Sequence, residues 1–449
     1  MHLANLKSPE LAEGDTKMGG VLDPTRLQRR WQLIILTAIL SIIIFLFFSF
    51  EHPRSPKEIA DPLPISQLGI SLHNQGTSNT PIKPKDVKVI GLVFFGRKDR
   101  VRILKCYLER NLAINGGWLD EVHWVRNTNT KDDVDYLHDL IASNPAYKQI
   151  EIKETGFIGY GLAWSTLEEG AIYVKIDDDV VFMADDAVAR VVSTKLAHPE
   201  YLVVSANMIN SPLMGWVHYH MGATHPYLPE LINPEDISPE LAPGQDKRPE
   251  TAKRTPWRYT QHPYWTGPDD YFFSFEQEPP SMRHRWLRLP TDVENQVRQI
   301  RRTPISDAEY STWGNSVQSW AIAAQQHYSF LENLYEDQLD LYQFSPKAQA
   351  WVTDYQRLSI NFIAINATEI LSHLPMNTVD EEWLTVALPK KIGKSVAVDS
   401  HALAVHFSFG GQGSVQTSDL LGRYLDYALE NACMAPAPGA KGMKGSYYV

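Results

Sequence analysis

The chain is poor in cysteine and has no concentration of positive charge. Its 449 residues include only two cysteines, Cys106 and Cys433, which lie too far apart in sequence to indicate a disulfide framework. These two can pair with each other or stay buried as free thiols. Acidic residues outnumber basic ones by 53 to 42, and nothing in the sequence resembles a sustained basic face. The resulting net charge of -11 argues against nucleic acid as a partner.

The sequence also lacks internal repeats and any dense set of histidines and aspartates. Metal-dependent phosphoesterases usually assemble two metal ions from several Asp and His motifs, so this absence disfavours that class. With 43% hydrophobic and 21% charged residues, the chain can bury a large core, and its length alone suggests two or three domains.

One long hydrophobic run stands near the N-terminus. Residues Trp31–Phe50 contain no charged side chain over 20 positions, enough for a helix to cross the roughly 30 Å hydrocarbon core of a bilayer. A cleaved signal peptide would have a shorter apolar core and would not follow a long polar leader. Arg26, Arg29 and Arg30 place the N-terminal side in the cytosol by the positive-inside rule. We therefore predict a single-pass type II membrane protein with a cytosolic tail at 1–30 and an anchor at 31–50.

After this run the composition changes twice. Residues 51–86 are rich in Pro, Ser, Asn and Gly and suit a flexible stem. From residue 87 onward, apolar strands alternate with amphipathic helices. The expected strands are Val87–Phe95, Leu119–Val125, Gln149–Lys153 and one that begins at Ile172. The expected helices are one that carries Val101, Leu104, Leu108 and Leu112 on one apolar stripe, one at Asp132–Ala142 and one at Gly161–Glu169. This alternation predicts an α/β fold with a mostly parallel, Rossmann-like sheet flanked by helices, whose ligands bind at the carboxyl ends of the strands.

The C-terminal part of the predicted domain, which spans 87–433, is less regular. Its expected elements are a strand at Tyr201–Ala206, a polar and aromatic loop at Asn207–His220, a Pro-rich insertion at 226–256, helical patterns between Ser306 and Gln343, a strand at Ala402–Phe407 and a helix at Ser418–Asn431. The tail at 434–449 is low in complexity and is expected to be disordered. Candidate sugar contacts in the loop are Asn207, Asn210, His218 and His220, with Trp216 as an apolar face.

The stretch Ile172–Phe182, IYVKIDDDVVF, joins an apolar strand to three adjacent carboxylates, Asp177, Asp178 and Asp179. Carboxylates this close repel one another unless a hard divalent cation lies among them. Because residues two apart on an extended chain point the same way, Asp177 and Asp179 can converge on one ion while Asp178 faces elsewhere. The alternative is an acidic turn that closes a buried strand and binds no metal.

Two basic turns are expected at the same edge of the sheet as the aspartates. Arg97 and Lys98 follow the first strand, and Arg126 follows the second. Cations on two loops and carboxylates on a third are what a metal-bound diphosphate requires.

Together, the N-terminal run, the stem, the βα unit that opens at VIGLVFFGRKDRV and the strand ending in three aspartates resemble the metal-dependent glycosyltransferases of the GT-A fold. The resemblance covers about Val87–Phe182 well and the rest, an acceptor-side region, poorly. The arrangement is also similar to a group of fungal type II membrane proteins that carry segments like GGWLDEV and VKIDDD and are regarded as glycosyltransferases.

The resemblance implies a metal site. Asp177 and Asp179 are expected to bind Mn²⁺ or Mg²⁺, which bridges the two phosphates of a nucleotide-sugar donor, while Asp178 contacts the ribose or the sugar. His406, in AVHFSF, matches the C-terminal histidine that often supplies a third ligand, and His401 is a weaker match. Alternatively, His406 is a partly buried histidine bonded to neighbouring backbone.

The loops supply the other donor-site candidates, Arg97, Asp99 and Arg126. A guanidinium can pair with phosphate, and a carboxylate can hold ribose or uracil. A polar turn at the start of a helix is common in α/β proteins, however, and Asp99 can instead cap the helix.

An inverting glycosyltransferase also needs a carboxylate that takes the proton from the acceptor hydroxyl. Two acidic groups compete for this catalytic role: Asp380-Glu381-Glu382, which we favour, and Asp269-Asp270 in the aromatic loop WTGPDDYFF. The alternatives are a favourable helix-dipole interaction for the first group and a solvated turn for the second. A retaining enzyme would need neither.

The sequence thus predicts a membrane-anchored, Golgi-type glycosyltransferase that transfers a sugar from a nucleotide diphosphate sugar to a glycan or a small hydroxylated acceptor. A lumenal domain fits the single N-glycosylation sequon, at Asn366. The alternatives are an anchored carbohydrate-binding or scaffold protein without turnover, and a metal-dependent phosphoesterase.

Overall fold

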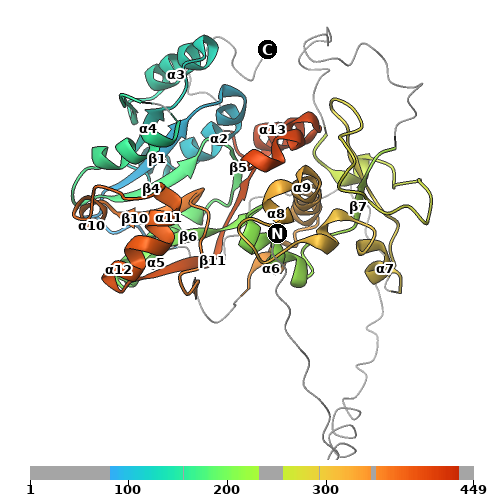
Figure 1. Cartoon of the computed structure of the whole chain (residues 1–449). Helices are drawn as coiled ribbons and strands as arrows, with labels where there is room; N and C mark the ends of the chain where they lie inside the picture. Colours follow the sequence, from blue (N-terminus) through green and yellow to red (C-terminus); the bar gives the residue numbers. More distant parts are fainter. Residues whose placement is uncertain (1–80, 155, 232–255, 293, 345–349, 434–449) are drawn as a thin grey trace, which may run out of the picture. The chain divides into compact units, whose positions relative to one another are not determined.

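The computed structural model of the chain describes residues 81–154, 156–231, 256–292, 294–344 and 350–433 (Figure 1). The predicted cytosolic tail, anchor and C-terminal tail lie outside these residues, as do most of the predicted stem and of the Pro-rich insertion. None of the helices in the described part is both long and apolar enough to span a membrane. The described part thus contains no counterpart to the predicted single-pass anchor, which corrects the prediction of a Golgi membrane protein as far as these residues are concerned.

The first half of the described chain builds a parallel sheet in the order β3-β2-β1-β4. Its strands are β1 (Val89–Phe95), β2 (Glu121–Arg126), β3 (Tyr147–Ile150) and β4 (Ile172–Asp177). The helices that connect them are α2 (Lys98–Asn111), α3 (Lys131–Ser143) and α4 (Gly156–Ala163). The apolar runs of β1 and β4 are almost completely buried, as inner strands of a parallel sheet must be. The α/β prediction is confirmed for this half.

The second half makes the sheet mixed. Its strands are β5 (Val180–Met183), β6 (Tyr201–Ile209), β9 (Ala350–Val352), β10 (Phe362–Asn366) and β11 (Ser395–His406). Strand β10 lies between β4 and β6 and runs antiparallel to both. Strand β11 is parallel to β6, whereas β5 and β9 pair with β11 in the antiparallel sense. Six strands, β1–β4, β6 and β11, thus run in one direction, and β5, β9 and β10 run in the other. The sheet is mixed but mostly parallel, as predicted.

Helices cover both faces of the sheet (Figure 1). Successive residues of β1 alternate between two hydrophobic clusters, with Val93 and Phe95 in one and Leu92 and Phe94 in the other. The first cluster includes side chains of α2, α5 (Ala187–Ala197), α9 (Trp320–Tyr335) and α13 (Leu420–Asn431). The second includes side chains of α6 (Pro212–His220) and α12 (Leu388–Ile392).

The segment Asn207–His220, predicted as a loop, instead forms the end of β6 and helix α6. Pro212 opens this helix in its first turn, where the missing N–H costs nothing. The remaining short elements are β7 (Tyr227–Pro229) and β8 (Trp286–Arg288), which form a separate two-stranded sheet, and α7 (Gln296–Ile300), α8 (Asn315–Gln318), α10 (Ala367–Leu371) and α11 (Asp380–Glu382).

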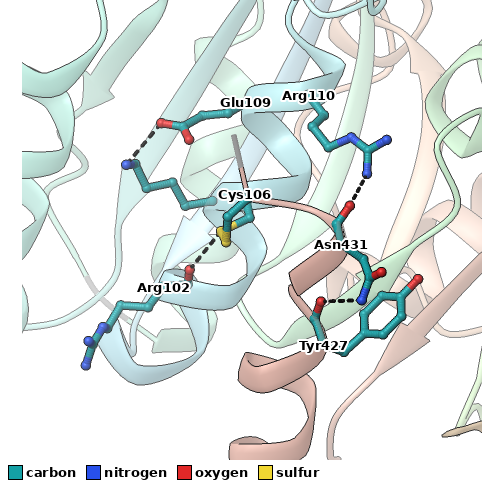
Figure 2. The surroundings of a disulfide bond; sticks show 8 residues. Arg102, Cys106, Glu109, Arg110, Tyr427 and Asn431 are labelled. Atoms are coloured by element: carbon teal, nitrogen blue, oxygen red, sulfur yellow. Dashed lines mark hydrogen bonds and ion pairs between the residues drawn. A yellow bond between two sulfur atoms is a disulfide. The ribbon is translucent and has the colours of Figure 1, made fainter. Parts of the chain in front are cut away.

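Cys106 in α2 and Cys433 after α13 form a disulfide across a sequence separation of 327 residues (Figure 2). The structure thus decides between the two alternatives left open by the sequence. Next to the bond, the guanidinium of Arg110 donates a hydrogen bond of 2.9 Å to the carbonyl oxygen of Asn431. The end of the described chain is therefore tied to the first helix of the fold.

Candidate active site

The three aspartates lie where β4 ends and β5 begins. Asp177 is the last residue of β4, and the chain turns through Asp178 and Asp179 into β5. Because β10 runs antiparallel to β4, its N-terminal end lies next to Asp177, and the pairing of β11 with β5 brings His406 beside Asp179. Ligand atoms of Asp177, Asp179 and His406 all lie within 4.8 Å of one another. We call these three residues together with Asp178 the aspartate cluster.

Asp177 is the most accessible of the three carboxylates, with 24% of its side chain exposed. One oxygen pairs with the ammonium group of buried Lys175, which also donates a hydrogen bond of 2.8 Å to the carbonyl oxygen of Ile360. The other oxygen accepts a hydrogen bond of 2.7 Å from the side-chain amide of Asn361, just before β10. Two elements distant in sequence thus hold this carboxylate.

Asp178 turns toward the loop after β1. Its carboxylate accepts hydrogen bonds of 2.8 Å from the backbone N–H of Gly96 and of 2.5 Å from Arg97 Nη2. A Cβ atom at Gly96 would lie 3.0 Å from Asp178 Oδ2, so the close approach of this backbone favours glycine. The orientation agrees with the expectation that Asp178 faces elsewhere than its two neighbours.

Asp179 is the most deeply buried aspartate of the cluster. Its Oδ1 lies 3.1 Å from His406 Nε2, and its Oδ2 lies 3.0 Å from Arg100 Nη1 and 3.2 Å from Arg97 Nη2. Burial alone would raise the pKa of Asp179, but His406 and the two arginines hold that pKa far below its usual range. The carboxylate is therefore ionised at neutral pH.

The donor atoms of the cluster fit a hard divalent cation. Two carboxylates and an imidazole are ligands that Mn²⁺ and Mg²⁺ accept. The Nδ1 atom of His406 is buried and has no hydrogen-bond partner within the described structure. The negative charges are matched by Arg97, Arg100 and Lys175, but the side chain of Arg97 is 46% exposed and can move, whereas that of Arg100 is 4% exposed.

The backbone around His406 is held by Asn210, which adopts a left-handed conformation with a φ of 56°. The amide of Asn210 donates hydrogen bonds of 3.2 Å and 3.0 Å to the carbonyl oxygens of His406 and Phe407, and it exchanges hydrogen bonds with Gln412. Asparagine tolerates this conformation better than most residues. Asn210 is therefore a structural residue and not the predicted sugar contact.

Two other predicted sugar contacts are also inside the fold. Asn207 and His218 are buried and bond to each other across 2.8 Å, and burial lowers the pKa of His218 to about 3. His220 is exposed on α6, where its ring lies 4.1 Å from that of Trp216. Asn207 and His218 are thus excluded from a sugar site, because neither has a surface that a ligand can reach.

A cavity of about 70 Å³ is linked to the aspartate cluster through one aromatic residue. Phe409 connects the two, because its ring lines the cavity and lies 4.5 Å from the ring of His406. The lining also includes Trp313, whose side chain is 65% exposed and lies under the guanidinium of Arg357 at 4.6 Å. The cavity therefore combines an aromatic face with polar groups.

Glu381 is the member of the predicted acidic group that lines this cavity. It accepts a hydrogen bond of 2.7 Å from Arg357 Nε, yet burial raises the pKa of Glu381. Asp380 instead accepts a hydrogen bond of 3.2 Å from the indole of Trp164. Glu382 is more exposed, at 35% of its side chain, and lies 3.8 Å from Arg357.

Four other predicted residues stay apart from the cluster. Arg126 donates a hydrogen bond of 3.1 Å to the carbonyl oxygen of Thr128 in its own loop, and Asp99 is exposed in the first turn of α2. Asp269 and Asp270 are exposed in the segment before β8. Over the described ranges, none of these side chains forms a hydrogen bond or ion pair with the aspartate cluster.

Asn366 and His401 also have local partners. The side chain of Asn366 caps α10 by accepting a hydrogen bond of 3.1 Å from the backbone N–H of Glu369. It lies at the end of β10 opposite the aspartates, and the predicted glycosylation stays a prediction. His401 lies inside β11, where its Nδ1 is 3.0 Å from the hydroxyl of Ser400.

Sequence reasoning missed Arg100, Lys175 and Asn361. Lys175 carries a signal, because a lysine inside the apolar strand IYVKI needs a carboxylate partner when buried. Arg100 stands one helical turn after a loop arginine, which gives no comparable indication. Asn361 precedes a strand whose direction in the sheet cannot be read from its own residues.

No protein-family model matches the chain, and no curated protein does. Among solved structures, GalNAc-T7 with UDP, GalNAc and Mn²⁺ is 11% identical over 72% of this chain and 44% of its own, with a TM-score of 0.34. The mannosyltransferase PcManGT from Pyrobaculum calidifontis, in complex with GDP-Man and Mn²⁺, is 21% identical over 28% and 38%, with a TM-score of 0.24. The 4-diphosphocytidyl-2C-methyl-D-erythritol synthase from Anaerococcus prevotii is 13% identical over 27% and 55%, with a TM-score of 0.22. The chain spans about half or less of these proteins, and the scores are too low to establish a shared fold or activity.

Proposed function

We propose that the domain at 87–433 is a GT-A-like, metal-dependent glycosyltransferase that moves a sugar from a nucleotide diphosphate donor to a hydroxylated acceptor. One observation carries the proposal: two carboxylates and an imidazole converge beside an exposed arginine, and Phe409 links them to a cavity that is lined by the half-buried Glu381. The first set suits a diphosphate with its cation, and the second suits the activation of a hydroxyl group.

On the donor side, Asp177, Asp179 and His406 would hold Mn²⁺ or Mg²⁺. Such a cation supplies positive charge that offsets the charge developing on the departing nucleoside diphosphate. Arg97 is the protein's own contribution to the same task, because its exposed guanidinium can leave its carboxylate partners and pair with a phosphate. Asp178 keeps its hydrogen bond to the backbone of Gly96 and so holds the loop in place.

On the acceptor side, Glu381 is the proposed catalytic base. Its raised pKa makes it a better proton acceptor than an exposed glutamate, and Arg357 fixes its orientation. The acceptor oxygen attacks the anomeric carbon and forms the new glycosidic bond, while the bond from that carbon to the diphosphate breaks. The hydroxyl proton passes to Glu381. Trp313 offers a flat apolar face on which a sugar acceptor can rest.

The test measures release of nucleoside diphosphate from a panel of nucleotide sugars by the purified full-length protein. We expect release that requires Mn²⁺ or Mg²⁺ and stops with a chelator. Asp179→Asn should lower the rate by about 10²–10³-fold, since it removes a charged group that positions the leaving group. Glu381→Gln should lower transfer by about 10²–10⁴-fold, the usual contribution of a general base.

Asp270→Asn serves as the matched control, because it removes an exposed carboxylate that was the alternative base and should leave the rate unchanged. Release of nucleoside diphosphate without a metal would contradict the proposed metal dependence. An unchanged rate in Glu381→Gln together with a lower rate in Asp270→Asn would contradict the assignment of Glu381 as the catalytic base.

A second candidate, a carbohydrate-binding protein without turnover, is favoured by a separate observation. Arg97, Arg100 and Lys175 already pair with the three aspartates, so the cluster is electrically balanced without a cation. Calorimetric titration distinguishes the two functions. Donor binding that is insensitive to Mn²⁺, with no release of nucleoside diphosphate, would support the binding protein.

A further inference from the structure

A second cavity, of about 170 Å³, lies between β8, helices α9 and α13, and the segment that precedes β8. It is smaller than the roughly 300–1,000 Å³ of pockets that enclose drug-sized ligands, which suits a single ring. Its lining shares no residue with the cavity at Glu381. Neither the proposed transfer reaction nor the aspartate cluster uses it.

One wall of this cavity is a stack of aromatic rings. The ring of Tyr328 lies 5.6 Å from that of Tyr227 and 6.3 Å from that of Trp286, and both pairs are stacked, at 28° and 22°. All three side chains are buried, whereas Tyr264, which also lines the cavity, is 56% exposed. The cavity thus has a fixed aromatic wall and one accessible ring near the solvent.

Hydrogen-bond donors without partners lie in the same lining. The indole N–H of Trp286 is buried and has no hydrogen-bond partner among the described residues. His262 accepts a hydrogen bond of 3.1 Å from Arg285 at its Nδ1, so its neutral ring carries the proton on Nε2, which is buried and also has no partner among the described residues. A buried donor is costly unless an acceptor reaches it, and a ligand that enters the cavity can supply one.

The charges around the cavity cancel. Arg423 pairs with Asp419, and Arg288 lies 2.9 Å from Glu332. Burial lowers the pKa of His262 to about 4, so this lining residue is neutral at pH 7. A phosphate or a carboxylate would meet arginines that are already neutralised. A neutral ligand with hydroxyl oxygens fits better, because it accepts hydrogen bonds without bringing a charge.

We propose that this cavity binds one neutral sugar ring, at a site separate from the candidate active site. The apolar C–H face of a sugar ring matches the aromatic wall, and its hydroxyl oxygens match the unpaired donors. Helix α9 separates the two sites: His327 contacts the carbonyl oxygen of Phe407 at 2.8 Å, beside the aspartate cluster, while the next residue, Tyr328, lines the cavity. The proposal requires neither a metal nor a nucleotide.

The test is ligand-observed saturation-transfer NMR on the purified full-length protein with a chelator present and no nucleotide. The probes are glucose, galactose, mannose and N-acetylglucosamine, with glucuronate and glucose 1-phosphate as charged comparators. We expect at least one neutral sugar to bind more tightly than either charged one. Tyr264→Ala should weaken that binding at least tenfold, and Phe272→Ala, which truncates an exposed ring outside the lining, should leave it unchanged.

Trp286→Phe keeps the aromatic face but removes the N–H, and it should weaken binding about tenfold, the effect of one hydrogen bond. Asp179→Asn should retain full sugar binding even though it disables the proposed transfer, which separates a failure of one proposal from a failure of the other. Each of four results would overturn the assignment of this cavity as a sugar site: no binding by any of the four neutral sugars, tighter binding of a charged probe, wild-type binding by Tyr264→Ala, or loss of binding in Asp179→Asn.

Discussion

Removal of the disulfide between Cys106 and Cys433 should destabilise the protein severely. A cross-link stabilises the folded state mainly by restricting the unfolded chain, and its effect grows with the logarithm of the loop that it closes. For a sequence separation of 327 residues, the chain-entropy relation gives about 6 kcal/mol at 25 °C. Because whole domains are stable by about 5–15 kcal/mol, Cys433→Ser should leave a protein close to its folding limit.

The measurement is urea denaturation, followed by the fluorescence of the chain's 12 tryptophans. With a denaturant slope of about 3 kcal/mol per molar, the upper end for small proteins, a loss of 6 kcal/mol lowers the midpoint by about 2 M. Wild-type protein in reductant should unfold at the same urea concentration as Cys433→Ser without reductant. Cys106→Ser provides the matched control, and the double variant should add nothing further, because both substitutions remove the same bond.

Mass spectrometry should first confirm that the disulfide is intact in the wild-type protein. The entropic argument would be refuted if the urea midpoint of Cys433→Ser lay within 0.3 M of the wild-type midpoint, a difference of about 1 kcal/mol at that slope. Separate midpoints for the two single variants would show that one thiol has a role outside the disulfide.

Three further predictions concern the candidate site. Arg100→Met should lower the free energy of unfolding, measured by urea denaturation, by about 3 kcal/mol, because it leaves the buried Asp179 carboxylate with fewer partners. The control Arg298→Met, on the surface, should change it by less than about 0.5 kcal/mol. Equal effects of the two substitutions would contradict the ion-pair reasoning. Because the pKa of Glu381 is raised, the rate should fall with decreasing pH already above the ordinary glutamate value, and a pH profile of initial rates should lose this limb in the remaining activity of Glu381→Gln. Trp313→Ala should raise the KM for the acceptor about tenfold and leave the KM for the donor unchanged; the reverse pattern in steady-state kinetics would place Trp313 on the donor side.

The parallel half of the fold could be predicted from the sequence because its strands are continuous apolar runs. VIGLVFF and IYVKI are buried on both faces, so their residues show the burial directly. Strand β10, FIAIN, is equally buried, but nothing in its five residues states that it runs antiparallel between β4 and β6. The direction of a strand is set by its neighbours, so the antiparallel strand inside this mostly parallel sheet could not be predicted.

The same limit applies to the candidate site. The aspartates could be located because the carboxyl ends of parallel strands meet at one edge. That rule cannot find Asn361, which reaches the edge from the amino end of an antiparallel strand. Helix α6 was predicted as a loop for another reason. The polar side chain of His218 is buried against Asn207, so it interrupts the apolar stripe by which a surface helix is identified in a sequence.

The position of β10 also sets an order of events during synthesis. Asp177 cannot form its hydrogen bond to Asn361 until that residue, 184 positions later in the chain, has been synthesised. The edge of β4 stays unpaired until Asn366, the last residue of β10, has emerged from the ribosome. At about 5–20 residues per second, this interval lasts roughly 10–40 s on the ribosome. An open strand edge pairs readily with other chains, so the nascent protein is exposed to aggregation for that time. Slower translation of this interval should therefore lower the yield of folded protein, and a chaperone that shields the β4 edge should restore it.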